Sequence, residues 1–260
     1  MILCGITPRI LTRRLSSNPS ETMNESLSTL NNPIWHSLNS RHSSSALAEG
    51  IARRFDPEIG PLSAIPEQSS EGFRDLARLF PPDEAAVLFL NSEPMLPEGW
   101  TIRLHQPMGQ MICLGEAIVP PNSPKVEVLG PEDIPEMLAL TALTEPGPFR
   151  ARTAELGGFF GIREAGRLAA MTGQRLALET IDGTGITEIS AVCTHPDFRG
   201  RGYARILVAA VAQAIRQRSE IPILHVLASN AAAIKVYESV GFSIRQTLHV
   251  VAATAPIPAR

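Results

Sequence analysis

The chain has 260 residues, of which 44% are hydrophobic and 19% are charged, and its formal net charge is −3. This composition excludes a disordered or fibrous protein. No dense basic stretch predicts nucleic-acid binding, and no apolar run reaches the roughly 20 residues that a membrane helix needs. Cys4, Cys113 and Cys193 lie far apart, which favours a reducing cytoplasmic compartment and predicts neither disulfides nor a metal site.

The first 120 residues divide into two predicted parts. Residues 1–22 are rich in Ser, Thr and Arg, and we interpret them as a disordered tail or as the product of an upstream start codon before Met23. Residues 23–120 predict a smaller α/β half. Its expected elements are a helix in the later part of 32–55, a helix at 71–80, a strand at 85–90 and two strands within 100–114 around Pro107.

A Pro-rich stretch at 120–124 predicts a linker, and the second half of the chain, 125–254, has clearer patterns. Strands are expected at 126–129, 159–162, 168–178, 187–194, 221–227 and from 242 onward. Helices are expected after Gly130, at 202–218 and at 231–240, the last closed by Gly241. This order predicts an α/β domain with a mixed sheet.

The segment that joins strand 187–194 to helix 202–218 has the properties of an anion cradle. A helix N-terminus presents unpaired N–H groups, two glycines allow a ligand to approach the backbone, and arginines add charge suited to phosphate. Neither a Walker sequence nor a complete dinucleotide fingerprint occurs here, and a solvated basic loop is the alternative. The residues of this loop are Arg199, Gly200, Arg201, Gly202, Tyr203, Ala204 and Arg205.

Two motifs together resemble the GNAT superfamily of acyl-CoA N-acyltransferases. The first is the loop 199–204, which follows a strand and the turn Thr194-His195-Pro196. The second is similar to the closing motif of that family and consists of Asn230, Ala233, Tyr237, Gly241 and Phe242. The resemblance covers 189–242. It implies a mostly antiparallel twisted sheet flanked by helices, a catalytic domain at 125–254, and an N-terminal half that is either an addition or a degenerate copy.

The resemblance also implies the roles of individual residues. Acetyl-CoA would be the acyl donor, with its pyrophosphate over 199–205 and its pantetheine arm along Val192, Cys193 and Thr194. Asn230 would complete the cofactor site, and a backbone N–H near Val192 would stabilise the oxyanion.

The attacking amine must lose a proton, and the departing thiolate must gain one. We expect Glu188 to be the general base, with its pKa raised by burial, and Tyr237 to be the general acid. A solvated carboxylate and a core aromatic are the respective alternatives. Strand alternation predicts that Glu188 and Val192 share one face, whereas Ile189 and Cys193 share the other. Cys193 is expected to be a core residue rather than a nucleophile.

These inferences predict an N-acetyltransferase that acts on a primary amine of a small molecule or peptide through a direct ternary complex. The acceptor pocket is expected to involve 141–160 and 244–254. An acyl-CoA sensor without turnover and a glycine-type N-acyltransferase with a larger acyl group are the alternatives. No nucleic-acid or membrane partner and no metal are expected.

Overall fold

A computed structural model describes residues 19–121 and 123–256. Part of the predicted tail, 1–18, lies outside these residues. The helices are α1 (Pro19–Ser26), α2 (Pro33–Leu38), α3 (Ser70–Arg78), α4 (Ile134–Thr144), α5 (Tyr203–Gln217) and α6 (Ala231–Val240). The strands are β1 (Ala46–Glu49), β2 (Ala52–Phe55), β3 (Ser63–Ala64), β4 (Ala85–Leu90), β5 (Thr101–Ile112), β6 (Glu127–Leu129), β7 (Phe159–Glu164), β8 (Arg167–Glu179), β9 (Gly185–Thr194), β10 (Ile221–Leu227) and β11 (Ser243–Thr254).

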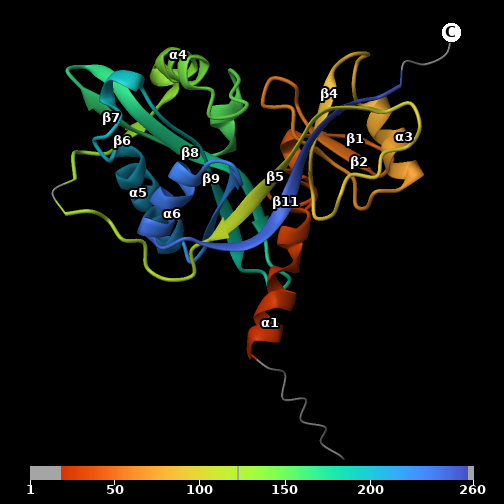
Figure 1. Ribbon diagram of the computed structural model, residues 1–260, viewed down its shortest axis with the longest axis horizontal. Coiled ribbons are helices and arrows are strands. Elements are labelled where there is room, and N and C mark those ends of the chain that lie inside the picture. Colours follow the sequence, from red (N-terminus) through yellow and green to blue (C-terminus); the bar gives the residue numbers. More distant parts are fainter. Residues whose placement is uncertain (1–18, 122, 257–260) are drawn as a thin grey trace, which may run out of the picture.

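One large sheet organises the molecule (Figure 1). Its eight strands follow the order β4-β11-β5-β10-β9-β8-β7-β6, and every pair is antiparallel except β9 and β10. Strands β1 to β3 form a second, smaller antiparallel sheet. The predicted fold class, a mixed and mostly antiparallel sheet flanked by helices, is therefore confirmed.

The large sheet crosses the division predicted at 120–124. Strands β4 and β5 come from the N-terminal half, and β5 lies between β10 and β11 of the C-terminal half. The hydrophobic core also contains residues of both halves, since Leu30 and Ile34 pack in one cluster with Leu176 and Ile223. The two halves thus share one sheet and one hydrophobic core. The predicted domain boundary at 120–124 stays a prediction.

The prediction for 32–55 was wrong in its position. The helix occupies the early part, α2, where the Asn32 side chain accepts a hydrogen bond from the backbone N–H of Trp35 and Pro33 begins the first turn. The later part forms the hairpin β1–β2, whose turn contains Gly50 at a φ of 47°. The backbone N–H of Ile51 donates to Asp75 of α3, which fixes this turn against the helix.

Residues 101–112 form one strand, β5, rather than the two strands predicted around Pro107. In an antiparallel strand, the N–H and C=O of one residue point to the same side. The Pro107 carbonyl accepts a hydrogen bond from Ala228, on the β10 side, just beyond the last residue of β10, Leu227. The missing N–H of Pro107 therefore costs the β11 ladder no hydrogen bond, and the strand continues.

Helices α5 and α6 cover one face of the sheet, and α4 covers the other (Figure 1). The buried side of α5 includes Leu207, Val211 and Ile215, spaced four residues apart as expected for one helical face. Gly241 ends α6 at a φ of 115°, which confirms the predicted C-cap.

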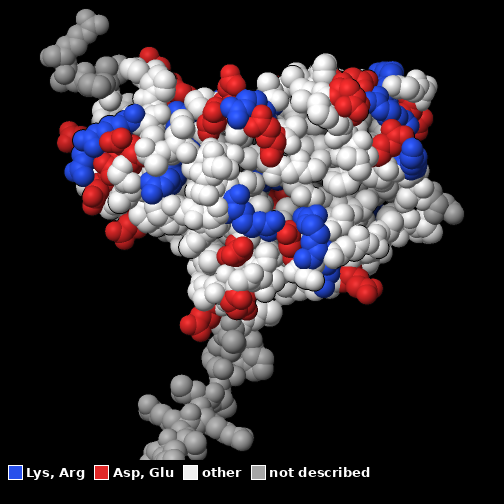
Figure 2. Space-filling model, turned by 180° about the vertical axis from the view of Figure 1, so that it is seen from behind, with Lys and Arg blue, Asp and Glu red and all other residues white. Residues whose placement is uncertain are grey.

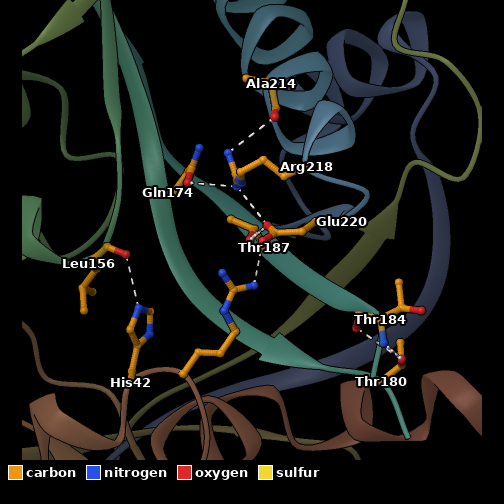
Figure 3. A network of polar contacts seen from close by, with 10 residues as sticks. His42, Leu156, Gln174, Thr180, Thr184, Thr187, Ala214, Arg218 and Glu220 are labelled. Atoms are coloured by element: carbon orange, nitrogen blue, oxygen red, sulfur yellow. Dashed lines mark hydrogen bonds and ion pairs between the residues drawn. The ribbon is translucent and has the colours of Figure 1, made fainter. Parts of the chain in front are cut away.

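A partly buried carboxylate also joins the two halves (Figure 3). Glu220 accepts hydrogen bonds from Arg41 at 2.8 Å, Arg218 at 2.9 Å and Thr187 at 2.6 Å. Partial burial acts to raise the pKa of Glu220, but these partners outweigh burial and lower the pKa. The carboxylate therefore ties the segment after α2 to the start of β9 and the end of α5.

No helix among the described residues is long and apolar enough to cross a membrane.

Candidate active site

Strands β9 and β10 separate in the middle of the sheet. They pair in parallel from Ile186 and Ile221 to Ile189 and Leu224, and no pairs follow. Strand β9 nevertheless continues to Thr194 with β8 as its neighbour. One edge of residues 190–194 is thus free of strand partners, and its backbone groups can bind an extended ligand as an added strand would.

A bulge in β9 lies at this separation. Ser190 is opposite Gly173 and Cys193 is opposite Met171, so Ala191 and Val192 together are opposite one residue of β8. Ala191 has a φ of 53°, a left-handed conformation that is uncommon for alanine. The bulge changes the direction of the backbone groups at the free edge.

The bulge makes the predicted alternation wrong beyond Ser190. Val192 packs with Ile189 in the cluster under α5, whereas Ala191 and Cys193 pack with the cluster under α4. Val192 therefore shares a face with Ile189. The extra residue at the bulge shifts the side chains that follow it to the opposite face of the sheet.

A cleft of about 420 Å³ begins at the separated strands. Its lining includes Ser190–Val192 of β9, Asn230 and Tyr237. It also includes Thr144–Pro148 and Val250, from the two segments predicted to contribute to the acceptor pocket. Sequence reasoning missed the side chains that the N-terminal half adds to this cleft, which are Leu62, Val87, Phe89, Leu104, Gln106 and Met108.

The glycine-rich loop leads from β9 into α5. Gly200 and Gly202 have φ values of 79° and 77°, and a Cβ atom at either would have no heavy atom within 4 Å. The space over the loop is therefore open. The Arg205 Nε atom is buried and has no hydrogen-bond partner among the described residues. An anion over this loop would supply the missing partner.

The other charged loop residues differ in their surroundings. Arg199 is exposed, and Arg201 lies 3.3 Å from Glu164 of β7. The Tyr203 hydroxyl donates a hydrogen bond to Glu164, which raises the pKa of this phenol. Tyr203, the first residue of α5, is also buried against side chains of β7 and β8. The structure thus gives Tyr203 a structural contact in addition to its position in the loop, and Glu164 is a partner that the sequence motifs did not reveal.

Glu188 is fully buried and lies at the centre of a charged network. Its oxygens accept hydrogen bonds from Arg175 Nε at 2.9 Å, Arg175 Nη2 at 2.7 Å and the Leu176 N–H at 3.3 Å. His225 Nδ1 lies 2.7 Å from Glu188 Oε1, and His225 Nε2 lies 3.1 Å from Gln110 Nε2. Since the Gln110 amide can only donate there, His225 Nε2 is the acceptor and Nδ1 carries the proton that binds Glu188.

The pKa shift predicted for Glu188 was wrong in direction. Burial does act to raise the pKa, but the charge of Arg175 and the hydrogen bonds from Arg175 and His225 outweigh burial and hold the pKa well below its usual range. The carboxylate is therefore charged at neutral pH. Arg175 and His225 both line the cleft, and neither was identified from the sequence.

Tyr237 and Asn230 both line the cleft. Burial raises the pKa of Tyr237 to about 12, so its phenol stays protonated at neutral pH. Among the described residues no group hydrogen-bonds to its hydroxyl. The Asn230 side chain accepts a hydrogen bond from the Ala233 N–H at 3.1 Å and so caps α6.

Cys193 is buried in the α4 cluster, and burial raises the pKa of its thiol to about 11. The thiol is therefore protonated at neutral pH, as expected of a core cysteine rather than a nucleophile. His195, in the turn after β9, accepts a hydrogen bond at Nδ1 from the Asp197 N–H, also a structural contact.

The separated parallel strands, the bulged strand and the glycine-rich helix start together form the fold that the two sequence motifs predicted. Comparison with known proteins agrees. A family model described as FR47-like protein matches residues 160–250. A structure from Novosphingobium aromaticivorans, assigned to the GNAT family of acetyltransferases, is 38% identical, covers 88% of this chain and 99% of its own, and superposes with a TM-score of 0.78.

The chain therefore belongs to the GNAT family of acetyltransferases. Two more distant structures show the fold alone. A GCN5-related N-acetyltransferase from Kribbella flavida is 17% identical with a TM-score of 0.54, over 85% of this chain and 95% of its own. A Drosophila protein is 15% identical with a TM-score of 0.55, over 77% and 73%. No curated protein sequence matches this chain.

Proposed function

We propose that this protein transfers the acetyl group of acetyl-CoA to a primary amine within a ternary complex. The observation that carries the proposal is the free edge of β9 at 190–194, which connects the open glycine-rich loop to the cleft beside Tyr237. This continuous path suits a long thin donor with an anionic end and a reactive end.

The residues of the loop fit the donor. The unpartnered Arg205 Nε and the open space over Gly200 and Gly202 suit a pyrophosphate group. Arg199 is exposed beside them and adds a positive charge. Val192 and Thr194 offer backbone groups to the pantetheine arm, and an N–H near Val192 is our candidate for the oxyanion contact.

The reaction requires two proton transfers, one away from the attacking amine and one to the departing sulfur. The amine nitrogen attacks the thioester carbonyl, the C–S bond breaks, and Tyr237 donates a proton to the departing sulfur. Because both oxygens of Glu188 and both ring nitrogens of His225 are already hydrogen-bonded, we assign the proton of the amine to a water molecule in the cleft, beside the charged Glu188 carboxylate. Arg175 holds the Glu188 carboxylate in place.

The lining of the cleft supports an amine with an apolar body. Most of the side chains are apolar, and Glu145 is the one acidic residue among the described residues that line the cleft. Basic and acidic side chains are mixed in small clusters on the face shown in Figure 2, with uncharged surface between them. Neither feature favours a strongly basic peptide as the acceptor, so a small amine is the preferred class.

Titration calorimetry with acetyl-CoA, followed by a thiol-release assay over a panel of small apolar and polar amines, tests the proposal. We expect saturable binding, and thiol release that depends on an amine and falls in the Tyr237→Phe variant. Binding without release for any amine would favour the sensor alternative. Faster release from a longer acyl-CoA would favour the glycine-type alternative. Absence of binding would refute the proposal.

A further inference from the structure

Three potential metal ligands meet beside strands β5 and β11, on the face of the sheet opposite the cleft. His105 belongs to β5, His249 belongs to β11, and Glu93 lies in the segment between β4 and β5. One ligand atom of each residue lies within 4.8 Å of the other two. Among residues 19–121 and 123–256, this is the one such group of histidine, cysteine and carboxylate side chains.

The sheet holds the two histidines close together. Strands β5 and β11 run side by side (Figure 1), with His105 opposite Val251 and His249 opposite Pro107. The histidines are therefore diagonal neighbours on one face of the ladder. The alternate residues Leu104, Gln106 and Val250 line the cleft on the other face.

The distances between the three side chains suit one small cation. His105 Nε2 is 2.9 Å from His249 Nδ1 and 3.7 Å from a Glu93 oxygen, and His249 Nδ1 is 3.9 Å from the other Glu93 oxygen. Ligand atoms at zinc-bond lengths around a tetrahedral ion lie about 3.3 Å apart, by simple geometry. The three distances fall on both sides of this value, so small side-chain rotations bring all three groups into coordination.

The exposure of the three side chains leaves room for water beside a bound ion. The side chains of His249 and His105 are 17% and 30% exposed, whereas that of Glu93 is 76% exposed. The imidazoles are thus fixed in partly buried positions, and the carboxylate approaches from the solvent side. Water can reach a fourth position, as in zinc sites with three protein ligands.

We propose that Glu93, His105 and His249 form a binding site for a divalent transition-metal ion of the zinc type. Two imidazoles and one carboxylate are a ligand set that zinc prefers, whereas magnesium and calcium prefer oxygen ligands alone. The competing explanation is a direct hydrogen bond between the two imidazoles beside a solvated carboxylate. Spacing along the chain predicts no metal site, because Glu93, His105 and His249 are distant in sequence and come together only through the pairing of β5 with β11.

Such an ion has a structural consequence for residues 91–100. Gln68 already binds this segment from one side, since its Nε2 donates to Ser92 Oγ at 2.9 Å and its Oε1 accepts from the Met95 N–H at 2.7 Å. The metal connects the same segment to β5 and β11 from the other side. The same segment lines part of a cavity of about 460 Å³ through Asn91, Ser92 and Met95. Gln68 and the metal ion would together fix this part of the cavity lining.

The test uses the full chain after treatment with a chelator. Calorimetric titration with zinc chloride alone is expected to show one saturable site, and cobalt(II) is expected to give the visible absorption of a low-symmetry site with nitrogen ligands. Either His105→Ala or His249→Ala should weaken zinc binding at least tenfold. His36→Ala, which removes a histidine outside the cluster, is the matched control and should bind zinc as the unchanged protein does.

Glu93→Gln is a second variant for the case in which a histidine variant misfolds. The Glu93 side chain is largely exposed, so its replacement should leave the sheet unchanged. This variant should also bind zinc more weakly and give an altered cobalt(II) spectrum. Zinc binding that is absent, or that is equal in the unchanged protein and both histidine variants, would overturn the proposal. Equal binding of magnesium chloride would overturn the assignment to a zinc-type ion. None of these results depends on acetyltransferase activity.

Discussion

Replacing Glu188 with Gln is expected to destabilise the protein strongly. The substitution keeps the shape of the side chain but removes the charge that faces Arg175, whose own side chain is only 14% exposed. Breaking a buried ion pair by removing one partner costs about 3–5 kcal/mol. Since the amide oxygen still accepts one hydrogen bond, we expect about 3 kcal/mol. For a chain of this size that corresponds to a fall in melting temperature of roughly 6–12 °C.

Urea denaturation at pH 7, followed by circular dichroism, measures this cost. Glu155→Gln is the matched control, because Glu155 also pairs with an arginine, Arg152, but both side chains are well exposed. The control should change the unfolding free energy far less than Glu188→Gln does, because exposed ion pairs contribute little to stability. Adding Arg175→Met to Glu188→Gln should recover part of the loss, since no cation is then left unpaired. A Glu188→Gln variant as stable as the control would refute the reasoning.

The pH dependence of stability gives an independent check on the same carboxylate. The pKa of Glu188 is lower in the folded protein than in the unfolded chain, where it is about 4.3. Its stabilising contribution is therefore complete above the unfolded pKa and is lost as the pH falls through the folded pKa. Between pH 5 and pH 3, the unchanged protein should lose stability more steeply than Glu188→Gln. Equal slopes would contradict the shift.

Three further predictions concern the donor site and the strand beneath it. Tyr237→Phe should lower kcat by about 10²-fold or more with little change in KM, as for other general acids, and steady-state kinetics measure both. Arg205→Gln should weaken acetyl-CoA binding about tenfold in calorimetry, as loss of a charged hydrogen bond does, whereas the exposed Arg103→Gln should not. Because its thiol has a pKa of about 11, Cys193 should resist iodoacetamide at pH 8 in the folded protein, as peptide mapping can measure.

The sequence predicted the elements that depend on local signals. Residues 203–217 carry a regular apolar face, and Gly241 ends α6 in a left-handed conformation that glycine adopts without strain. The glycine-rich loop was likewise recognisable, because it requires particular residue types at fixed spacing. The same spacing predicts Asn230 as a cofactor residue, and the structure shows that its side chain caps α6.

The environment of Glu188 could not be predicted, because it depends on strand register. Arg175 and His225 lie 13 and 37 residues from Glu188 in the sequence, and they reach it only through the pairing of β8, β9 and β10. Without these partners, burial alone predicts a raised pKa, whereas the structure gives a lowered one. No local signal marks Ala191 as the bulged residue, so the alternation of β9 also could not be corrected in advance.

The position of β5 gives the N-terminal half a direct part in the candidate site. In β5, Leu104, Gln106 and Met108 alternate toward the cleft, between strands that come from the C-terminal half. The same strand hydrogen-bonds to both β10 and β11, so the wall of the cleft depends on strand pairing between the two halves. The motifs for the proposed donor site lie in the C-terminal half, whereas the proposed acceptor surface contains residues of both halves. This division explains why the sequence indicated the donor more clearly than the acceptor.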